Sequence, residues 1–598
     1  MPGYKAPIED TLFLLRDVLG YERLGNLAGF AEAPLDVVEA ILGEAAKLAE
    51  EVFQPLNRIG DLQGCTRHQD GRVTTPKGFK PAYDAFRQGG WIGLSAPAAY
   101  GGQGLPMTLT SVLGEYLSAA NLALSMYPGL TQGAIAAILA HGSDEQKSTF
   151  LPKMIAGEWS GTMNLTEPQC GTDLGLIKTR AAPNEDGSYA ITGTKIFISS
   201  GEHDLTENII HLVLARIEGA PQGTKGISLF IVPKRRVKED GSLGEPNGVS
   251  CGSIEHKMGI HGNATCVMNY DGAIGFLVGE ANRGLNAMFV MMNEARLAVG
   301  VQGLAQSEAA YQNAAAYAKE RLQGRALSGP KQPTKPADPI IVHPDIRRLL
   351  MSMRAFNEGA RALVLWTAMK ADVSHRSDND ADRRAALDHL GLMTPIVKGV
   401  LTDTGFENTV KAQQVFGGHG YIAEWGMEQF VRDARIAMLY EGANGIQAMD
   451  LVGRKLGKDG GRAALAFFNE VTSFIKESGA DESLAGFVKP VERALGHLQQ
   501  ATMWFMQNAL ARPDHAGAGA TDYMHMFGLV ALAYMWARIV KAAQTKLTAG
   551  DDGETARMEG KIATARFFMQ RMLPETGAQL ARITSGADSV MALAAEAF

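Results

Sequence analysis

The sequence predicts a mainly helical α+β protein, in which one β-rich segment lies between helical segments. Apolar residues recur every three or four positions in "LDVVEAILGEAAKLAEEVFQPLN", as in an amphipathic helix. The segments "GSYAITGTKIFISSG" and "KGISLFIVPKRR" are rich in β-branched residues and are bounded by turn residues, which indicates strands. Helical periodicity then returns at about Gly284 and continues to the end of the chain.

A chain of 598 residues is too long for one ordinary domain, and these patterns divide it into four. We expect an N-terminal helical domain (residues 1–160), a middle β domain of barrel-like or sandwich form (161–280), a helical domain (281–456) and an additional C-terminal helical domain (457–598). The tripeptide "EDG" at Glu185–Gly187 predicts a hairpin turn within the β domain.

The helical pattern from Leu285 to Arg325 is longer than an ordinary helix, so Gly300 and Gly303 are expected to bend it. Arg321 and Arg325 are four residues apart and are expected to share one helical face. Two guanidinium groups on one face suit a pyrophosphate, although a solvated charged face is an equally good interpretation. The segment Ser328–Pro339 contains four prolines and predicts an exposed loop.

Composition is that of a globular protein, with 46% hydrophobic and 20% charged residues. A formal net charge of -7 argues against nucleic acid as the main partner, because phosphate binding needs a basic surface. Four cysteines in so long a chain do not make a disulfide framework, which favours a reducing compartment. With no leader pattern and no segment of membrane-spanning length and hydropathy, we expect a cytoplasmic protein.

Two segments, a turn-forming loop at the entry to the β-rich part and a strand within it, offer groups for binding. "NLTEPQCGTD", Asn164–Asp173, combines hydroxyls with free backbone N–H groups and can bind a flat heteroaromatic ring or a phosphate, but an ordinary capped turn has the same composition. In "GTKIFISSG", alternation is expected to place Ile196 and Ile198 on one face and Phe197 and Ser199 on the other. A sheet-core phenylalanine with an incidental serine is the simpler interpretation.

Glu441 is the carboxylate of interest in the C-terminal half. It follows the apolar "IAML" and Tyr440 and precedes small residues. It is either a buried base, whose pKa burial would raise, or an acid favoured at the N-terminus of a helix.

"QVFGGHGY", Gln414–Tyr421, has clustered glycines without the strand of a Rossmann motif, so its backbone could approach another molecule closely. No metal site is expected at Cys251, His256, His261 and Cys266. They recur every five residues, which on a strand sends successive side chains to opposite faces and exceeds the usual spacing of paired zinc ligands.

Eight segments, in order and covering about Ile92 to Leu456, together resemble the acyl-CoA dehydrogenase family of flavoproteins. They are "APAAYGGQGLP", "HGSDEQKSTFLPKMIAGEW", "TEPQCGTDLGLIKTRA", "ITGTKIFISSG", "KMGIHGNATCVMNYD", "EARLAVGVQGLAQSEAAYQNAAAYAKERLQGR", "VFGGHGYIAEWGMEQFVRDARI" and "LYEGANGIQAMDLVGRKL". The resemblance implies an N-terminal helical domain, a middle β domain and a C-terminal four-helix bundle. It also implies FAD, a homo-oligomer such as a dimer, and electron transfer to electron-transferring flavoprotein.

The resemblance also assigns roles to residues. Glu441 matches the family's catalytic base. The residues implied in FAD binding are Leu165, Thr166, Gly171, Thr172, Phe197, Ser199, Arg321, Gln414, Gly417 and Gly418. Those implied in substrate binding are Met163, His261, Arg296, Tyr440 and Gly442. Ala443 and Gly445 stand where many members have a threonine and a glutamine, so those two FAD contacts are in doubt.

The implied reaction is α,β-dehydrogenation of an acyl-CoA thioester, in which Glu441 takes the α-proton and the β-hydride passes to the flavin. Hydrogen bonds from the flavin ribityl chain and the Glu441 N–H would stabilise the developing enolate. The length of the chain, "YKAP", "KMGIHG" and "YEGANGIQA" most resemble the 3-(methylthio)propanoyl-CoA dehydrogenase subgroup. A sulfur-accepting pocket could use Met163 or Met288–Met292, although plain helix core is the more common role of such a run.

Several alternatives share this fold. A medium- or long-chain fatty acyl-CoA dehydrogenase has the same base and cofactor. An acyl-CoA oxidase passes its electrons to oxygen. A nitroalkane oxidase relative would use an aspartate where this chain has Glu441. A flavin-containing DNA-binding protein would need a basic C-terminal domain, and the segment after Gly461 carries both signs of charge.

Overall fold

The computed structural model describes residues 2–550 and 553–598 and groups into two compact units. The sheet unit is Glu44–Ala298, and the helical unit is Met1–Gly43 together with Val299–Phe598. The boundary falls inside the long helix α8, Gly284–Glu320. The first 43 residues therefore group with the C-terminal half, although the sequence analysis placed them in the N-terminal helical domain.

In the sheet unit, most helices come first and the strands of the main sheet follow, as the residue patterns predict, while one short strand pair within residues 66–74 lies between helices. The helices are α2 (Leu35–Lys47, which begins in the helical unit), α3 (Asn57–Gln63), α4 (Phe79–Gln88), α5 (Met107–Ala120), α6 (Leu122–His141) and α7 (Asp144–Ile155). The strands are β1 (Thr66–Arg67), β2 (Val73–Thr74), β3 (Trp159–Asn164), β4 (Arg180–Pro183), β5 (Tyr189–Ser199), β6 (Asn208–Ile217), β7 (Ile227–Pro233), β8 (Arg235–Val237), β9 (Leu243–Pro246), β10 (Val249–Ile254) and β11 (Thr265–Val278).

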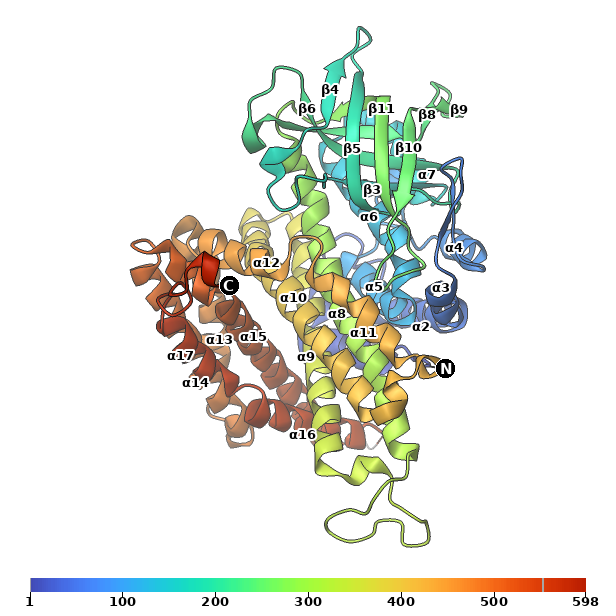
Figure 1. The fold of residues 1–598 in the computed structure, drawn as a ribbon. Helices are drawn as coiled ribbons and strands as arrows, with labels where there is room; N and C mark the ends of the chain where they lie inside the picture. Colours follow the sequence, from blue (N-terminus) through green and yellow to red (C-terminus); the bar gives the residue numbers. More distant parts are fainter. Residues whose placement is uncertain (1, 551–552) are drawn as a thin grey trace. The chain divides into compact units, whose positions relative to one another are not determined.

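Seven of these strands form one sheet in the order β10-β11-β5-β4-β6-β3, with β7 paired to β11 and β6 (Figure 1). The pairs β3–β6 and β4–β6 are parallel and the others are antiparallel. The predicted turn at Glu185–Gly187 is confirmed, since it joins the antiparallel strands β4 and β5 and Gly187 has a φ of 82°. The core of this sheet includes Ile191, Phe230 and Met268.

Helix α6 packs against β3, and Gly161 makes this contact possible. A Cβ at Gly161 would overlap the side chain of Ala134 on α6. The helix begins where Asn121 accepts a hydrogen bond from the Leu124 N–H, 3.1 Å away, which satisfies one of the free donors of the first turn. α6 thereby fixes the strand that leads into the loop Asn164–Asp173.

The helical unit contains every remaining helix. They are α1 (Ile8–Phe13), the second half of α8, α9 (Pro344–Arg376), α10 (Asp380–Val415), α11 (Met427–Arg435), α12 (Asn444–Asp450), α13 (Arg462–Ser478), α14 (Ala485–Asn508), α15 (Pro513–Ala549), α16 (Thr555–Arg571) and α17 (Glu575–Thr584). Together with the sheet of the other unit, they confirm the predicted class: mainly helical, with a middle β domain.

Helix α8 is continuous through Gly300 and Gly303, so neither glycine ends the helix, and the expected bend stays a prediction. These glycines have a role in packing. A Cβ at Gly303 would overlap the Leu401 carbonyl of α10, and a Cβ at Gly405 would overlap the Gly303 carbonyl. Small residues on both helices let their backbones approach closely, and this contact sets α8 against α10.

Helices α6 and α15 have the length and hydropathy of membrane-spanning segments, which corrects the expectation that no segment approaches them. In their apolar windows, 72% and 78% of the residues are buried within the protein. Such burial is typical of the core helices of a globular protein. Helix α15 contacts α9, α10, α12, α14, α16 and α17, so it is the central helix of the C-terminal segment.

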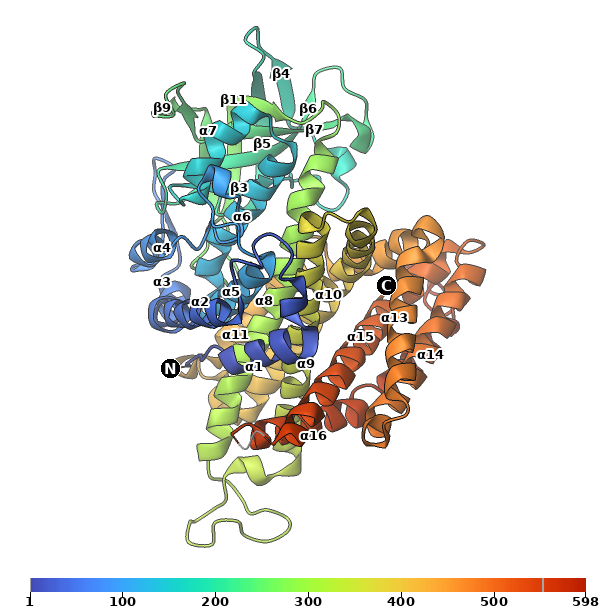
Figure 2. The ribbon, with the colours of Figure 1, turned by 180° about the vertical axis from the view of Figure 1, so that it is seen from behind.

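A buried charge cluster joins distant parts of the helical unit, with members on α1, α9 and α16 (Figure 2). Arg361 donates to Asp10 at 2.6 Å and to Glu308 at 3.1 Å. Lys561 contacts Asp10 and donates to Glu358 at 2.9 Å. Burial opposes ionisation of Asp10, but Lys561 and Arg361 more than offset it and lower the pKa of this carboxyl.

Loss of one cation from this cluster is expected to destabilise the protein strongly. Lys561→Met leaves the carboxylates of Asp10 and Glu358 in excess inside the protein, and we expect the free energy of unfolding to fall by about 3–5 kcal/mol. Urea denaturation monitored by circular dichroism measures this change.

The charge-balanced double variant Asp10→Asn/Lys561→Met is the control, because it removes one anion together with the cation. It should be more stable than Lys561→Met alone. If the double variant loses as much stability as Asp10→Asn and Lys561→Met lose together when measured separately, the Asp10 carboxylate and the Lys561 ammonium are not coupled.

Candidate active site

Glu441 lies in a short irregular segment between a 3-10 turn, Ile436–Met438, and helix α12. Its backbone is left-handed, with a φ of 56°, and Gly442 follows with a φ of 82°. Glycine adopts this conformation readily, but glutamate does so at a cost in free energy. The Glu441 turn, Tyr440–Ala443, therefore holds the backbone of Glu441 in a conformation that the surrounding structure must impose.

Three side chains impose it. The Tyr440 hydroxyl donates to Gln302 on α8. Gln447 donates to the carbonyl oxygens of Glu441, at 3.3 Å, and Gly442, at 3.1 Å, and the Lys398 ammonium donates to the Gly442 carbonyl at 2.9 Å. Burial and the neighbouring Glu441 carboxylate raise the pKa of Tyr440, so its hydroxyl keeps the proton that it donates. Both carbonyls of the turn are thus fixed from inside the helical unit.

A second predicted group gathers at the end of α10. Gln414, Gly417 and Gly418 are exposed, and a Cβ at either glycine would meet no atom of this chain within 4 Å. Tyr317 on α8 stacks on Phe416 with ring centroids 4.1 Å apart, which brings the ends of α8 and α10 together. Neither glycine is required by packing within the chain, but Gly417 has a φ of 58°, which favours glycine by itself. Close approach of another molecule remains the predicted role of Gly418.

Arg321 is exposed just beyond the end of α8, near this group, but Arg325 does not share a helical face with it. That prediction is wrong because the loop that follows closes around Asp338. The Asp338 carboxylate accepts hydrogen bonds from the N–H groups of Ala326, Lys331 and Gln332, and Arg325 donates to it at 3.3 Å. Although burial opposes ionisation, these donors hold the pKa of Asp338 well below its usual range.

In the sheet unit, Phe197 stands out because its ring is 60% exposed and its φ is 59°. The pairing of β5 with β11 explains both. Between the pairs Lys195–Met268 and Ile198–Cys266 the register shifts, so β5 carries an extra residue. This bulge breaks the predicted alternation: Lys195 and Ile198 are buried and Phe197 points outward. Ser199 is half-buried at the end of the strand, paired with Thr265.

The loop with Leu165 and Thr166 is attached to the same strand. The Ile196 N–H donates to the Thr166 carbonyl at 2.9 Å, and the Lys195 ammonium donates to the Leu165 carbonyl at 3.0 Å. The structure thus places Leu165 and Thr166 beside Phe197. Gly171 and Thr172, in the same loop, are exposed.

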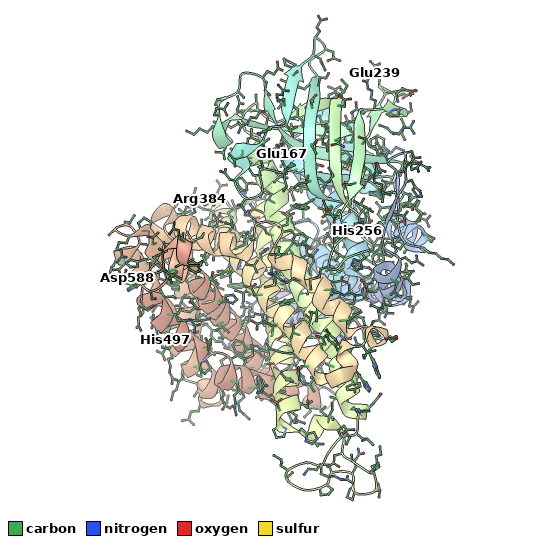
Figure 3. All side chains as sticks on the ribbon, viewed as in Figure 1. Glu167, Glu239, His256, Arg384, His497 and Asp588 are labelled. Atoms are coloured by element: carbon green, nitrogen blue, oxygen red, sulfur yellow. The ribbon has the colours of Figure 1, made fainter. Side chains whose placement is uncertain are left out.

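A buried ion pair supports this arrangement and was not predicted. Lys195 and Glu167 are 2.8 Å apart, and Glu167, labelled in Figure 3, also accepts hydrogen bonds from Thr179 and the Lys178 N–H. Burial opposes ionisation of Glu167, but Lys195 and these donors lower its pKa to about 2. The two residues are 28 positions apart, and no local pattern links them.

The remaining predicted residues have mixed surroundings. Met163 is half-buried on β3 and Arg296 is half-buried on α8. Both ring nitrogens of His261 face acceptors, the Asp61 carbonyl at 2.9 Å and the Lys257 carbonyl at 2.7 Å. Its role in substrate binding stays a prediction that competes with a structural one. In the methionine run, Met288 and Met291 are fully buried, as in plain helix core.

Glu294 is a carboxylate that the sequence analysis missed. It lies on α8, two residues before Arg296, and protein atoms enclose its carboxyl although the residue keeps some accessible surface. Burial raises the pKa of Glu294 to about 8. A carboxyl that is neutral at pH 7 is a feature of functional sites. A glutamate in a helix has no sequence signature that would separate it from a surface residue.

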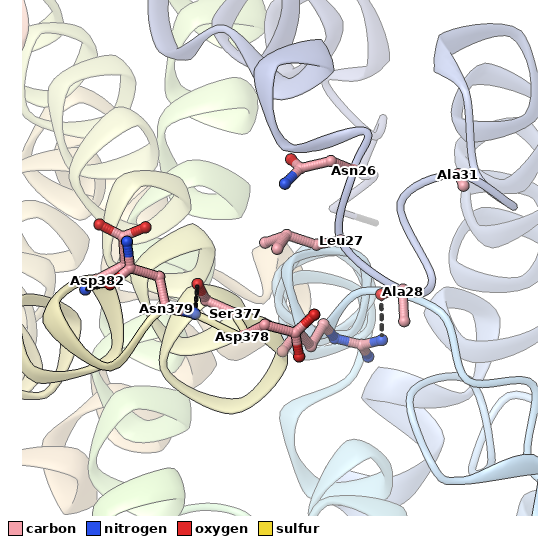
Figure 4. Close-up of a pocket in the computed structure, with 9 residues that line it drawn as sticks. Asn26, Leu27, Ala28, Ala31, Ser377, Asp378, Asn379 and Asp382 are labelled. Carbon is pink, nitrogen blue, oxygen red and sulfur yellow. Dashed lines mark hydrogen bonds between the residues drawn. The ribbon is translucent and has the colours of Figure 1, made fainter.

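A polar pocket of about 580 Å³ lies elsewhere in the helical unit, between residues 26–31 and the connection of α9 to α10 (Figure 4). The Arg376 guanidinium crosses it to donate to the Ala28 carbonyl at 2.7 Å. No residue of the predicted site lines it.

The raised pKa of Glu294 predicts a pH dependence of stability. Between the unfolded pKa of 4.5 and the folded pKa of about 8, the folded protein keeps a proton that the unfolded chain loses, so stability falls as pH rises. From about pH 5.5 to about pH 8, wild type should lose about 3 kcal/mol more than Glu294→Gln, measured by urea denaturation.

Glu320→Gln, on the exposed end of the same helix, is the matched control and should keep the pH dependence of wild type. Parallel curves for wild type and Glu294→Gln would contradict the raised pKa.

Four domain families match the chain in order. Residues 39–158 match the acyl-CoA dehydrogenase N-terminal domain, residues 162–273 the middle domain, and residues 282–456 the C-terminal domain. Residues 467–594 match a domain described as acetyl-CoA dehydrogenase C-terminal like.

Known proteins match over nearly the whole length. The chain is 42% identical to 3-methylmercaptopropionyl-CoA dehydrogenase of Ruegeria pomeroyi, over 98% of this chain and 99% of that one. It is 35% identical to the broad-specificity linear acyl-CoA dehydrogenase FadE5 of Mycobacterium tuberculosis, over 96% of each. In fold it is similar to Caenorhabditis elegans ACDH-11, solved in complex with C11-CoA, with a TM-score of 0.77, 19% identity, and coverage of 96% of this chain and 92% of that one. By its ordered domains and by its identity to whole-length relatives, the chain belongs to the acyl-CoA dehydrogenase family.

Proposed function

We propose that the protein is an FAD-dependent acyl-CoA dehydrogenase in which Glu441 removes the α-proton of the thioester. The observation that carries this proposal is the Glu441 turn. Glu441 has a left-handed backbone conformation, and Gln447 and Lys398 fix the carbonyl oxygens of Glu441 and Gly442. This conformation has a cost in free energy that ordinary packing does not require. A carboxylate held in this way keeps the orientation that proton transfer from carbon needs.

Each unit has residues whose chemistry fits one part of an FAD molecule, and by the family resemblance those of the helical unit would hold the FAD of a neighbouring subunit. An outward-facing aromatic ring at Phe197, beside the backbone of Thr166, can cover a flat heteroaromatic ring. The exposed Gly417 and Gly418, with Arg321 nearby, can approach a pyrophosphate and an adenosine. When bound, FAD accepts the hydride from the β-carbon of the substrate.

The protein's own contribution is to hold groups in place. Glu441 receives a proton, so its carboxylate has to be ionised and aimed at the α-carbon when the thioester binds. Tyr440 and Gln447 restrain the residues on either side of that carboxylate. Exclusion of water by the acyl chain would strengthen the base further, because a carboxylate loses its hydration when it is enclosed.

For the substrate, we propose 3-(methylthio)propanoyl-CoA, which would give 3-(methylthio)acryloyl-CoA. The support is 42% identity to a whole-length relative named for this substrate. A linear fatty acyl-CoA is the second candidate, because FadE5 is 35% identical over a similar length. We also propose a homodimer and electron-transferring flavoprotein as electron acceptor, as in the family, and a reducing cytoplasmic location, in keeping with four unpaired cysteines among the described residues.

An anaerobic titration tests the substrate. The purified yellow protein is mixed with 3-(methylthio)propanoyl-CoA, with butanoyl-CoA and with a longer linear acyl-CoA, and the absorbance of the oxidised flavin is followed. The methylthio thioester is expected to bleach the flavin with the highest kcat/KM. Equal or better bleaching by a linear thioester would move the assignment to fatty acyl-CoA, and no bleaching by any thioester would remove the dehydrogenase proposal.

Glu441→Gln is expected to keep FAD and to lower the rate of anaerobic bleaching by about a thousandfold, because the amide cannot accept the α-proton. Glu424→Gln, an exposed glutamate of the same unit, is the matched control and should bleach at the rate of wild type. Turnover retained in Glu441→Gln would take the role of base from this residue.

A further inference from the structure

Behind the Glu441 turn, the polar contacts continue into the protein through Asn444. Its side chain is buried and accepts a hydrogen bond from the Lys398 ammonium at 2.6 Å. The same ammonium donates to the Gly442 carbonyl at 2.9 Å. Lys398, which is fully buried on α10, therefore bridges the turn and the first residue of α12.

The Asn444 amide also faces inward, toward α10. Its Nδ2 donates to the Asp403 carboxylate at 2.7 Å, to the Thr402 hydroxyl at 2.9 Å and to the Gly399 carbonyl at 3.1 Å. The position of Asn444 is thus set by Lys398 on its oxygen and by these three acceptors on its nitrogen, of which the Asp403 carboxylate is the nearest. Movement of Asp403 would shift Asn444 and, with it, the ammonium that holds Gly442.

Asp403 is held in turn by the C-terminal helical segment. His525 on α15 lies 2.9 Å from its second carboxylate oxygen. Close packing fixes α15 at this level of α10: a Cβ at Gly399 would overlap Met524, and a Cβ at Gly528 would overlap Val400. These contacts leave little freedom for His525 to shift along α10.

We propose that His525 is a positioning residue for Glu441, and that the additional C-terminal helical segment is thereby part of the machinery that holds the catalytic turn. The relay runs from His525 through Asp403 and Asn444 to Lys398, which fixes the carbonyl of Gly442. This inference rests on the proposed role of Glu441 as the base.

The two contacts of Asp403 distinguish this proposal from a simple packing contact between α15 and α10. If His525 only attached α15 to α10, the chain of hydrogen bonds would end at the Asp403 carboxylate. Here one oxygen, Oδ2, contacts His525 and the other, Oδ1, accepts from Asn444, so the contact with α15 and the contact with the turn share one rigid group. Sharing of this kind couples the two sites energetically.

The test uses the full-length FAD-loaded protein and the substrate that bleaches it. In His525→Ala and Asp403→Ala, the rate of anaerobic bleaching at saturating thioester is expected to fall by about ten- to a hundredfold, the effect of a small misplacement of a catalytic group. His525→Gln keeps a donor and should lose less than about threefold, as a conservative rescue. The double variant should be no slower than the slower single variant, because the two residues act through one relay.

Tyr523→Phe is the matched control, because it removes another hydrogen bond of α15, between the hydroxyls of Tyr523 and Thr502 at 2.7 Å, without contact to the turn. It should bleach at the rate of wild type. If His525→Ala proves unstable, His525→Asn shortens the donor while keeping its polarity and should show the same fall in rate.

Two further readouts distinguish positioning from general support. The Kd of the thioester and the FAD content should stay at wild-type values while the rate falls. Amide hydrogen exchange of residues 440–447 should become faster in His525→Ala, with or without FAD. A wild-type rate in His525→Ala, or a rate that falls only together with FAD content and thioester affinity, would overturn the proposal.

Glu441→Gln in the same series keeps this test independent of the proposed function. If Glu441→Gln bleaches at the wild-type rate, the assignment of the base fails. If Glu441→Gln is inactive while His525→Ala is fully active, only the relay fails.

Discussion

The buried charge cluster around Asp10 is the interaction on which the helical unit depends. Three segments that are far apart in the sequence contribute charges that cannot be left alone in a low-dielectric interior: Asp10, Arg361 and Lys561. Each has a partner of opposite sign, and the pairs are completed by Glu308 and Glu358. Because an unpaired member would be costly, the N-terminal segment, the long bundle helices and α16 can satisfy these charges only by packing as one body.

Within the helical unit, the backbone of the Glu441 turn is strained, and contacts with surrounding residues offset the free-energy cost of this strain. A left-handed glutamate is unfavourable by itself, and it persists where several independent contacts determine it. Gln447 and Lys398 hold its carbonyl oxygens, and Tyr440 is anchored on α8. The helical scaffold thereby fixes the backbone that carries the Glu441 side chain.

In the sheet unit, a β-bulge and a buried ion pair position the candidate residues. A β-bulge in β5 turns Phe197 outward, and the buried pair of Lys195 and Glu167 ties the neighbouring loop to the same strand. The ion pair adds hydrogen bonds to two backbone segments, so it fixes geometry as well as charge. An outward-pointing aromatic ring beside an ordered loop backbone leaves a flat apolar face available for contact with another molecule.

The residue patterns by themselves determined the order of helical and β segments, the hairpin turn at Glu185–Gly187 and, through eight ordered motifs, the family. These are local signals: periodicity, turn residues and short motifs report on neighbours in the chain. They also selected Glu441, Phe197 and the glycines at the end of α10 as candidates. Where a prediction from neighbouring residues was wrong, the cause was a contact with a residue outside the local pattern. Helix α8 ends at Glu320, and the Asp338 carboxylate holds Arg325 in the loop that follows, outside the helix that its spacing suggested.

Only the tertiary structure decided how the candidates are held. The bulge that exposes Phe197 depends on the register of β11, the left-handed turn at Glu441 depends on Lys398 and Gln447, and the link to His525 spans 122 positions from Asp403. The sequence did not predict the burial of the Glu294 carboxyl either, because burial depends on how the whole chain packs. The physical reason is the same in each case: strain, burial and ion pairing arise between residues that meet only after folding, and no pattern of near neighbours contains them.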